Sequence, residues 1–243
     1  MENQEIINLQ NAQAEFISTV SHELRTPLTS IRGFADTLLT SGDKLSEEQR
    51  QKFLLIIKDQ ANRLIKLTEN LLAVSKNNVE KLVYKKVDIV PFIKNMVSLV
   101  SAQSTKNTFS LDFGKNIDEV LIDTDKFQQI MLNILENATK YSNSGTTITV
   151  DVLQDENFVK IKVSDEGIEI AEKDRDKIFE KFTRLSSPLT QKIEGSGLGL
   201  YLTKILVERM NGEITNYSED NKTVFEIKFP IAKFDDDVKV KIK

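Results

Sequence analysis

The only histidine of the chain, His22, stands beside groups that favour nucleophilic chemistry. Glu23 follows it directly, and Thr26 lies one helical turn further on the same face. Pro27 cannot donate a backbone hydrogen bond to the Glu23 carbonyl, which predicts a kink or a local loosening just after the histidine. An imidazole is a nucleophile near neutral pH, and a neighbouring carboxylate can orient it. A lone histidine is most often a solvated surface residue, but this combination predicts a side chain placed to react.

The helix that carries His22 is expected to turn it away from the core. Apolar residues fall at steps of three or four along one stripe, namely Phe16, Val20, Leu24, Leu28, Ile31, Ala35 and Leu38. At ~100° per residue, His22 lies ~160–200° around the helix from Val20 and Leu24. The imidazole therefore faces away from the stripe that would be buried.

A second polar cluster lies on a later predicted helix. Asn133 and Asn137 share one helical face, with Glu136 next to Asn137. Lys140 lies three residues beyond Asn137. Amide oxygens suit Mg²⁺, which takes few protein ligands and keeps several waters, and a lysine suits phosphate. A solvated helix face explains this cluster equally well when it is taken alone.

Two further stretches contain groups that could bind an amine and a phosphate. Asp165 follows a predicted strand and could accept from an exocyclic amine, although a simple strand-to-loop turn explains this stretch better when it is taken alone. Residues 195–200 form a glycine-rich turn before a helix, where backbone N–H groups can cradle a phosphate. No Gly-Lys-Ser/Thr follows, so the turn is no P-loop, and it is not the opening turn of a dinucleotide fold.

The first third of the chain predicts two long helices, at residues 5–40 and from Ser46 to about residue 75, joined by a turn at 41–44. Ser46 provides the N-cap of the second helix. The two helices expose more apolar stripe than they can bury on each other, which favours a symmetric dimer that closes a four-helix bundle. The alternative is that the stripes pack on the rest of the same chain.

From Lys81 onward, strands and helices alternate. Strands are expected at 87–89, 109–113, 120–122, 146–153, 158–163, 213–217 and 223–229, and helices at 90–104, 124–141, 174–182 and 198–210. This alternation predicts an α/β domain in which helices cover one face of a mixed sheet. The domains are therefore expected at residues 1–80 and 81–232, followed by a charged tail at 233–243.

The composition excludes several classes of function. The chain has 243 residues, a formal net charge of −4 and no cysteine. The net charge argues against a nucleic-acid binder, and the lack of cysteine excludes disulfides, thiolate metal sites and a cysteine nucleophile. No run approaches the ~18 apolar residues of a membrane span, and no signal peptide is visible.

Taken together and in order, these stretches resemble the sensor histidine kinases of two-component signalling over residues 14–230. The motifs of that family match residues 16–27 (phosphoacceptor box), 133–141 (asparagine box), 165–170 (first glycine box), 179–184 (phenylalanine box) and 195–200 (second glycine box). Five ordered motifs at suitable spacing make this resemblance specific.

The resemblance implies roles for individual residues. His22 would be the phosphorylated residue and Glu23 its acid/base neighbour. Thr26 would position the water that dephosphorylates a partner response regulator, and Arg184 would sit near the γ-phosphate during transfer. Asn137 would ligate Mg²⁺, with Asn133 and Glu136 supporting the site. The implied nucleotide-binding set is Asn133, Asn137, Lys140, Tyr141, Asp165 (for adenine), Gly167, Glu169 and, in the lid over the phosphates, Gly195, Gly197, Leu198 and Gly199.

The fold implied by the resemblance is an all-α helical hairpin that forms a dimeric four-helix bundle, followed by the ATP-binding α/β sandwich shared with Hsp90, gyrase and MutL ATPases. The implied activity is phosphoryl transfer from ATP·Mg²⁺ to His22 and then to an aspartate in the receiver domain of a response regulator, with phosphatase activity toward that regulator. The expected partners are that regulator and a second copy of the chain, without nucleic acid. The expected location is the cytoplasm, as a free protein or as the cytoplasmic portion of a membrane-bound sensor.

One position departs from the family pattern. The first glycine box usually has a glycine where this chain has Glu169. A glycine there permits close backbone approach at dihedral angles that are costly for other residues, and Glu169 adds bulk and negative charge near an anionic ligand. We therefore expect weakened ATP affinity or slowed autophosphorylation.

Two alternatives stay open on the sequence alone. The first is an ATPase of the same nucleotide fold that uses hydrolysis for conformational work, and the His22 motif argues against it. The second is a dimeric signalling scaffold with weak nucleotide binding, which Glu169 motivates.

Overall fold

In the computed structural model, the chain divides into two compact units, residues 1–79 and 80–243. The structure describes residues 2–75, 81–184 and 196–232. No helix in these ranges combines the length and the apolar character needed to cross a lipid bilayer.

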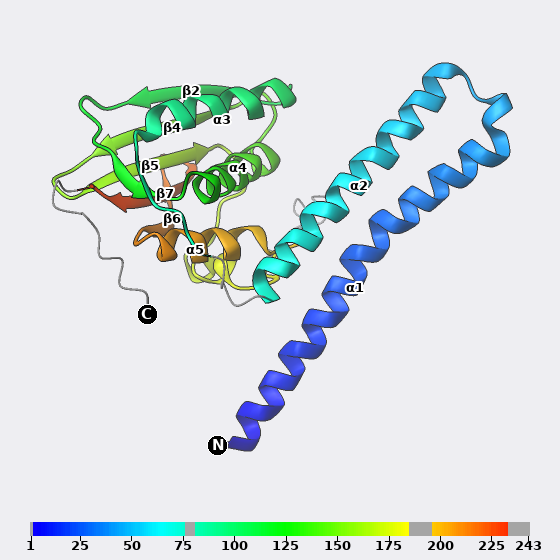
Figure 1. Ribbon diagram of the computed structural model, residues 1–243, viewed down its shortest axis with the longest axis horizontal. Coiled ribbons are helices and arrows are strands. Elements are labelled where there is room, and N and C mark those ends of the chain that lie inside the picture. The colour runs from blue at the N-terminus through cyan, green and yellow to red at the C-terminus, as the bar shows by residue number, and fades with distance from the viewer. Residues whose placement is uncertain (1, 76–80, 185–195, 233–243) are drawn as a thin grey trace. The chain divides into compact units, whose positions relative to one another are not determined.

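The first unit is a helical hairpin (Figure 1). Helix α1 (Glu2–Ser41) and helix α2 (Glu47–Ser75) are joined by the short 3₁₀ turn η1 (Gly42–Lys44) and run antiparallel. A capping box starts α2, because the Gln49 amide donates to the Ser46 hydroxyl at 3.2 Å and the Ser46 amide donates to the Gln49 side chain at 3.0 Å. The two helices expected from the apolar stripes are confirmed.

Helix α1 continues through Pro27 without a break in its helical backbone. Pro27 has no N–H, so the Glu23 carbonyl lacks its usual intrahelical donor. One residue earlier, the Thr26 hydroxyl donates to the His22 carbonyl at 3.3 Å. The kink or loosening expected after the histidine therefore does not end the helix.

The second unit is a two-layer α/β sandwich (Figure 1). Its main sheet has the strand order β2-β4-β5-β7-β6, in which only β2 and β4 are parallel, and β1 and β3 form a separate antiparallel pair. The strands are β1 (Lys85–Val87), β2 (Thr108–Phe113), β3 (Val120–Ile122), β4 (Thr147–Gln154), β5 (Phe158–Asp165), β6 (Glu213–Glu219) and β7 (Lys222–Pro230). The helices α3 (Ile89–Gln103), α4 (Thr124–Tyr141) and α5 (Gly199–Arg209) lie on one face of the main sheet. The expected fold class is confirmed.

Helix α4 packs along its whole length into the core of this unit. Its buried side chains are Phe127, Ile130, Met131, Ile134, Leu135 and Ala138. The Phe127 ring meets the Phe229 ring of β7 edge-on, with 5.9 Å between centroids. A helix held in this way gives fixed positions to the polar residues on its other side.

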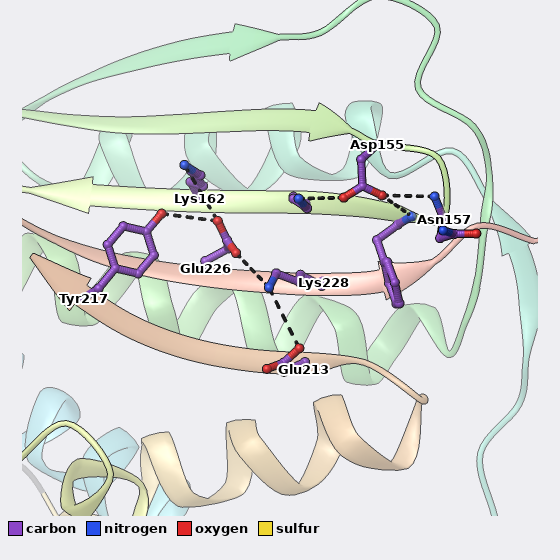
Figure 2. Close-up of polar contacts among 9 residues, drawn as sticks. Asp155, Asn157, Lys162, Glu213, Tyr217, Glu226 and Lys228 are labelled. Atoms are coloured by element: carbon purple, nitrogen blue, oxygen red, sulfur yellow. Dashed lines mark hydrogen bonds and ion pairs between the residues drawn. The ribbon is translucent and has the colours of Figure 1, made fainter. Parts of the chain in front are cut away.

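The opposite face of the sheet carries a network of charged side chains (Figure 2). Lys162 of β5 lies 3.7 Å from Glu226 of β7, and Glu226 lies 3.2 Å from Lys228. Lys228 also lies 3.9 Å from Glu213 of β6, and the Tyr217 hydroxyl donates to Glu226 at 3.2 Å. The cross-strand pairs Lys162–Glu226 and Lys228–Glu213 favour the observed register, and the whole network keeps this face polar.

The helix predicted at residues 174–182 is wrong. Two 3₁₀ turns occupy this region, η2 (Glu172–Asp174) and η3 (Lys177–Phe179). Phe182 has a φ of 62°, and its amide donates to the Gly197 carbonyl at 2.9 Å. This contact with a segment far along the chain replaces the helical hydrogen bond that the periodicity predicted.

The first short strand is also shifted from its predicted position. It ends at Val87, because Asp88 caps helix α3 by accepting from the Val90 amide at 3.0 Å. Ile89, predicted to end the strand, is instead the first residue of the helix and is fully buried.

Candidate functional site

His22 lies on the exposed side of α1, as the helical periodicity predicted. The carboxylate of its neighbour Glu23 lies 3.4 Å from the guanidinium of Arg63 on α2, and both side chains are partly buried. Thr26 is exposed one turn further along α1. The contact with Arg63 restricts the Glu23 carboxylate, so the group that follows the imidazole is held in place.

The α/β unit has an open pocket at the end of β5, beside α4 and α5. Its lining is Asn137, Tyr141, Asp165, Ile168, Ile170, Ile178, Thr183, Arg184, Leu200, Thr223 and Phe225. Apolar walls with a few polar groups are typical of a small-molecule site. The pocket therefore suits a flat apolar ring that carries a polar substituent.

Asp165, the last residue of β5, supplies the most buried polar group of this lining and is only 3 % exposed. Burial raises the pKa of its carboxyl to about 7, and the Lys106 ammonium opposes this increase. A buried carboxylate is stabilised by a ligand that donates to it. An exocyclic amine on an aromatic base meets this requirement.

Helix α4 presents Asn137 and Tyr141, four residues apart, to the same pocket. Asp123 fixes the start of the helix by accepting from the Asp125 and Lys126 amides at 3.0 and 3.1 Å. Burial raises the pKa of the Tyr141 hydroxyl, so this group stays protonated at neutral pH. The helix thus adds one amide and one hydroxyl to the polar groups that a ligand would meet.

Gly167 permits the loop after β5 to approach the end of α4. Its backbone forms a bridge with Ser142. A Cβ at this position would lie 2.3 Å from the Tyr141 carbonyl oxygen and 2.5 Å from the Asp165 carboxylate. Only glycine leaves room for this approach.

We expect Gly167→Ala to lower the affinity for ATP at least about tenfold, because the added methyl group forces Tyr141 and Asp165 apart. Isothermal titration of both proteins with ATP measures the change. Gly33→Ala is the matched control, since a Cβ there meets no atom within 4 Å. Equal affinities for wild type and Gly167→Ala would contradict the close approach.

Asn133, predicted to support a metal site, connects α4 to α5 in the structure. Its side-chain amide donates to the buried Thr203 hydroxyl at 2.8 Å. Its Oδ1 would lie 2.4 Å from a Cβ at Gly199, the first residue of α5. Asn133 is absent from the pocket lining, so its position favours a role in holding the start of α5 against α4.

The second glycine box packs against the phenylalanine box. Gly197 has a φ of 67°, and a Cβ there would lie 2.6 Å from the backbone of Phe182. Leu198, predicted to contact the nucleotide, is fully buried. Gly195, also predicted as a nucleotide contact, lies outside the described residues.

The remaining predicted residues differ in their distance from the pocket. Arg184 belongs to its lining, and the Lys140 ammonium lies 5.7 Å from the centre of the Tyr141 ring. Glu136 is exposed and lies outside the lining. Within the described ranges, no three acidic or histidine side chains cluster so that they could hold a metal by themselves. This arrangement fits Mg²⁺ held by Asn137 and mainly by phosphate oxygens, which is a coordination that Mg²⁺ accepts.

Glu169 is exposed and lies outside the lining. It is not among the described residues with a positive φ, so its backbone does not need a glycine. The backbone conformation therefore gives no reason to expect weaker ATP binding, and only the charge and bulk of Glu169 support that expectation. The weakened ATP affinity stays a prediction.

Sequence reasoning missed the apolar walls of the pocket and the partner of Glu23. The missed wall residues are Ile168, Ile170, Ile178, Leu200 and Phe225, together with Thr183 and Thr223. Apolar residues in strands and turns have the same pattern whether they line a pocket or fill a core. Arg63 lies 40 residues from Glu23, and only the register of the helical hairpin could have identified the pair.

Two family models match the chain. Residues 12–80 match the "His Kinase A (phospho-acceptor) domain", and residues 122–233 match the "Histidine kinase-, DNA gyrase B-, and HSP90-like ATPase". The chain is 34 % identical over 216 residues to sensor histidine kinase WalK of Bacillus subtilis (strain 168), covering 86 % of this chain and 35 % of that protein. It is 33 % identical over 233 residues to sensor protein kinase WalK of Staphylococcus aureus, covering 94 % and 56 %. The chain thus spans about a third to a half of the length of these relatives.

Solved structures share the fold. The histidine kinase AdeS of Acinetobacter baumannii superposes with a TM-score of 0.67 at 24 % identity, covering 87 % of this chain and 98 % of that one. Histidine kinase ThkA, in complex with response regulator protein TrrA, gives a TM-score of 0.69 at 21 % identity, covering 95 % and 65 %. At these identities the similarity extends to the fold alone.

Proposed function

Because the chain belongs to the sensor histidine kinases of two-component systems, we propose that it phosphorylates its own His22 with ATP and passes the phosphoryl group to an aspartate of a response regulator. One observation carries this proposal. The same chain has an exposed histidine next to an anchored carboxylate and a pocket with a buried carboxylate suited to adenine.

At His22, an imidazole nitrogen forms a bond to the γ-phosphorus while the bond from that phosphorus to the β,γ-bridging oxygen breaks. The leaving ADP takes the electron pair of the broken bond. Glu23, held by Arg63, accepts the proton that the imidazole loses. Such transfers depend mostly on positioning and charge neutralisation.

The pocket residues orient the nucleotide for this step. Asp165 accepts from the exocyclic amine of adenine, and the apolar walls pack against the ring. Asn137, with Glu136 next to it on α4, would hold Mg²⁺, which would neutralise phosphate charge when bound. Lys140 and Arg184 add positive charge where the phosphates would lie.

The helical hairpin supports a homodimer. Large apolar side chains stay exposed on it, namely Ile17, Leu28, Leu39, Leu54, Leu55, Ile65 and Leu72. Pairing two hairpins into a four-helix bundle would bury such a surface. The segment that joins the two units, near residues 77–82, would act as the hinge that brings His22 and the nucleotide together; residues 76–80 of it lie outside the described ranges.

The partner proposed for the phosphorylated chain is the receiver domain of a response regulator. The similar fold of ThkA, whose structure holds the response regulator protein TrrA, supports this choice. The regulator aspartate accepts the phosphoryl group and the imidazole leaves with the electron pair of the broken P–N bond. The same surface around His22 and Thr26 would also serve the dephosphorylation of the regulator, in which a water accepts the phosphoryl group.

Incubation with γ-labelled ATP tests the proposal. A kinase yields acid-labile phosphate bound to the protein, and that label moves to a receiver domain added afterwards. An ATPase of the same fold would release phosphate without labelling the protein. A scaffold with weak nucleotide binding would neither become labelled nor bind a nucleotide analogue.

Thr26→Ala should slow dephosphorylation of the regulator at least about tenfold and change autophosphorylation less than about twofold. The Thr26 hydroxyl is exposed one turn from His22, where it can accept a hydrogen bond from a water, but it is not needed for the attack on ATP. Loss of label from a phosphorylated receiver domain measures the first rate. Thr26→Ser keeps the hydroxyl and is the control, and equal loss of both activities in Thr26→Ala would contradict the assignment.

A further inference from the structure

Lys106, in the loop before β2, caps the end of helix α4. Its ammonium donates to the Thr139 carbonyl at 3.3 Å, to the Lys140 carbonyl at 3.5 Å and to the Ser142 carbonyl. The last carbonyls of a helix lack intrahelical donors and carry partial negative charge. A lysine from another segment therefore stabilises the turn that ends in Tyr141.

The backbone around Lys106 is itself anchored. Its amide donates to the Ser104 hydroxyl at 3.3 Å, and its carbonyl accepts from the Gly145 amide at 2.9 Å. The buried Asn107 side chain donates to the Asn143 carbonyl at 2.7 Å and to the Thr146 hydroxyl at 3.1 Å. The loop is thus built to hold the ammonium in one position.

This loop connects to the adenine corner of the pocket. Ser142, whose carbonyl accepts from Lys106, forms the backbone bridge with Gly167. Gly167 lies two residues after Asp165 and directly against the Tyr141 carbonyl. The Lys106 ammonium is also the charge that favours ionisation of Asp165 and lowers the pKa of that carboxyl against the effect of burial.

We propose that Lys106 is a positioning residue for adenine recognition: by clamping the end of α4, and through the Ser142–Gly167 bridge the loop after β5, it keeps the Asp165 carboxyl group aimed at the exocyclic amine. The inference rests on the proposed nucleotide site and adds to it a residue outside every motif of the family. Lys106 does not line the pocket, so it acts through Asp165, Tyr141 and Ser142 and never touches the nucleotide.

Two diphosphates test the proposal in the full chain, ADP and purine riboside 5′-diphosphate, which lacks the exocyclic amine. For Lys106→Met we expect ADP to bind about tenfold more weakly and the amine-free analogue at most about twofold more weakly. In the nucleotide-free protein, amide hydrogen exchange at the end of α4 should become faster in Lys106→Met. Lys106→Arg keeps a charged donor and should restore ADP affinity to within about threefold of wild type.

Lys160→Met is the matched control. The Lys160 ammonium pairs with Asp155 at 2.6 Å in the β4–β5 hairpin, so its removal subtracts the same charge from the same unit without touching α4. An equal loss for ADP and for the amine-free analogue, unchanged ADP affinity, or a Lys160→Met loss as large as that of Lys106→Met would each overturn the proposal. If the wild type itself bound neither diphosphate, the proposed function would fail instead.

Discussion

A His22→Gln variant will take up no phosphate from γ-labelled ATP, whereas the wild-type chain will acquire an acid-labile label. His22 is the only imidazole of the chain, and a glutamine amide is no nucleophile at neutral pH. The side chain is exposed, so the substitution should change the free energy of unfolding by no more than ~0.5 kcal/mol. Label retained on the filter before and after acid treatment measures both the yield and the type of bond.

Two controls separate lost chemistry from lost structure. His22→Gln should bind ADP within about twofold of wild type, because the histidine and the pocket lie in different compact units. Arg32→Gln changes another exposed side chain of α1 and should leave labelling intact. Label on His22→Gln would mean that another residue accepts the phosphoryl group.

The parts of the site that depend on local pattern could be predicted from the sequence. The exposure of His22 followed from its position opposite Val20 and Leu24. The bounds of α4 were predicted at residues 124–141 and are observed there, because Asp123 is a strong N-cap. Periodicity and capping involve residues that are only a few positions apart, so both can be recognised from the sequence alone.

Contacts between distant segments could not be predicted in the same way. The pairing of Glu23 with Arg63 depends on the register of two long helices, and the clamp by Lys106 depends on how a loop meets the end of α4. Asn133 was expected to support the metal site, and its hydrogen bond to Thr203 of α5 could not be predicted from its spacing to Asn137. Each of these contacts is set by packing, which a single sequence does not specify.

Asp165→Asn should abolish useful nucleotide binding, with an ADP affinity lower by on the order of 100-fold, or about 2.7 kcal/mol. The substitution removes the negative charge and replaces one of the two acceptor oxygens by an NH₂ donor, so the amine of adenine loses its charged acceptor. Isothermal titration with ADP measures the loss. The affinity for purine riboside 5′-diphosphate should fall far less, because this analogue has no exocyclic amine that could donate to residue 165.

The same substitution should make the nucleotide-free protein more stable, and the gain should depend on pH. The pKa of Asp165 is about 7 in the folded state, against 3.8 for the ordinary carboxyl, so the folded state binds the proton more tightly than the unfolded state. The free energy of unfolding therefore falls as the pH rises from about 4 to about 7, by at most about 4 kcal/mol for this group. Asparagine has no such dependence. Denaturant unfolding at about pH 5 and about pH 8 should thus show Asp165→Asn gaining more over wild type at the higher pH than at the lower one, and a difference independent of pH would show that Asp165 is already solvated. A carboxylate that costs stability in the empty pocket is one that the adenine amine stabilises on binding.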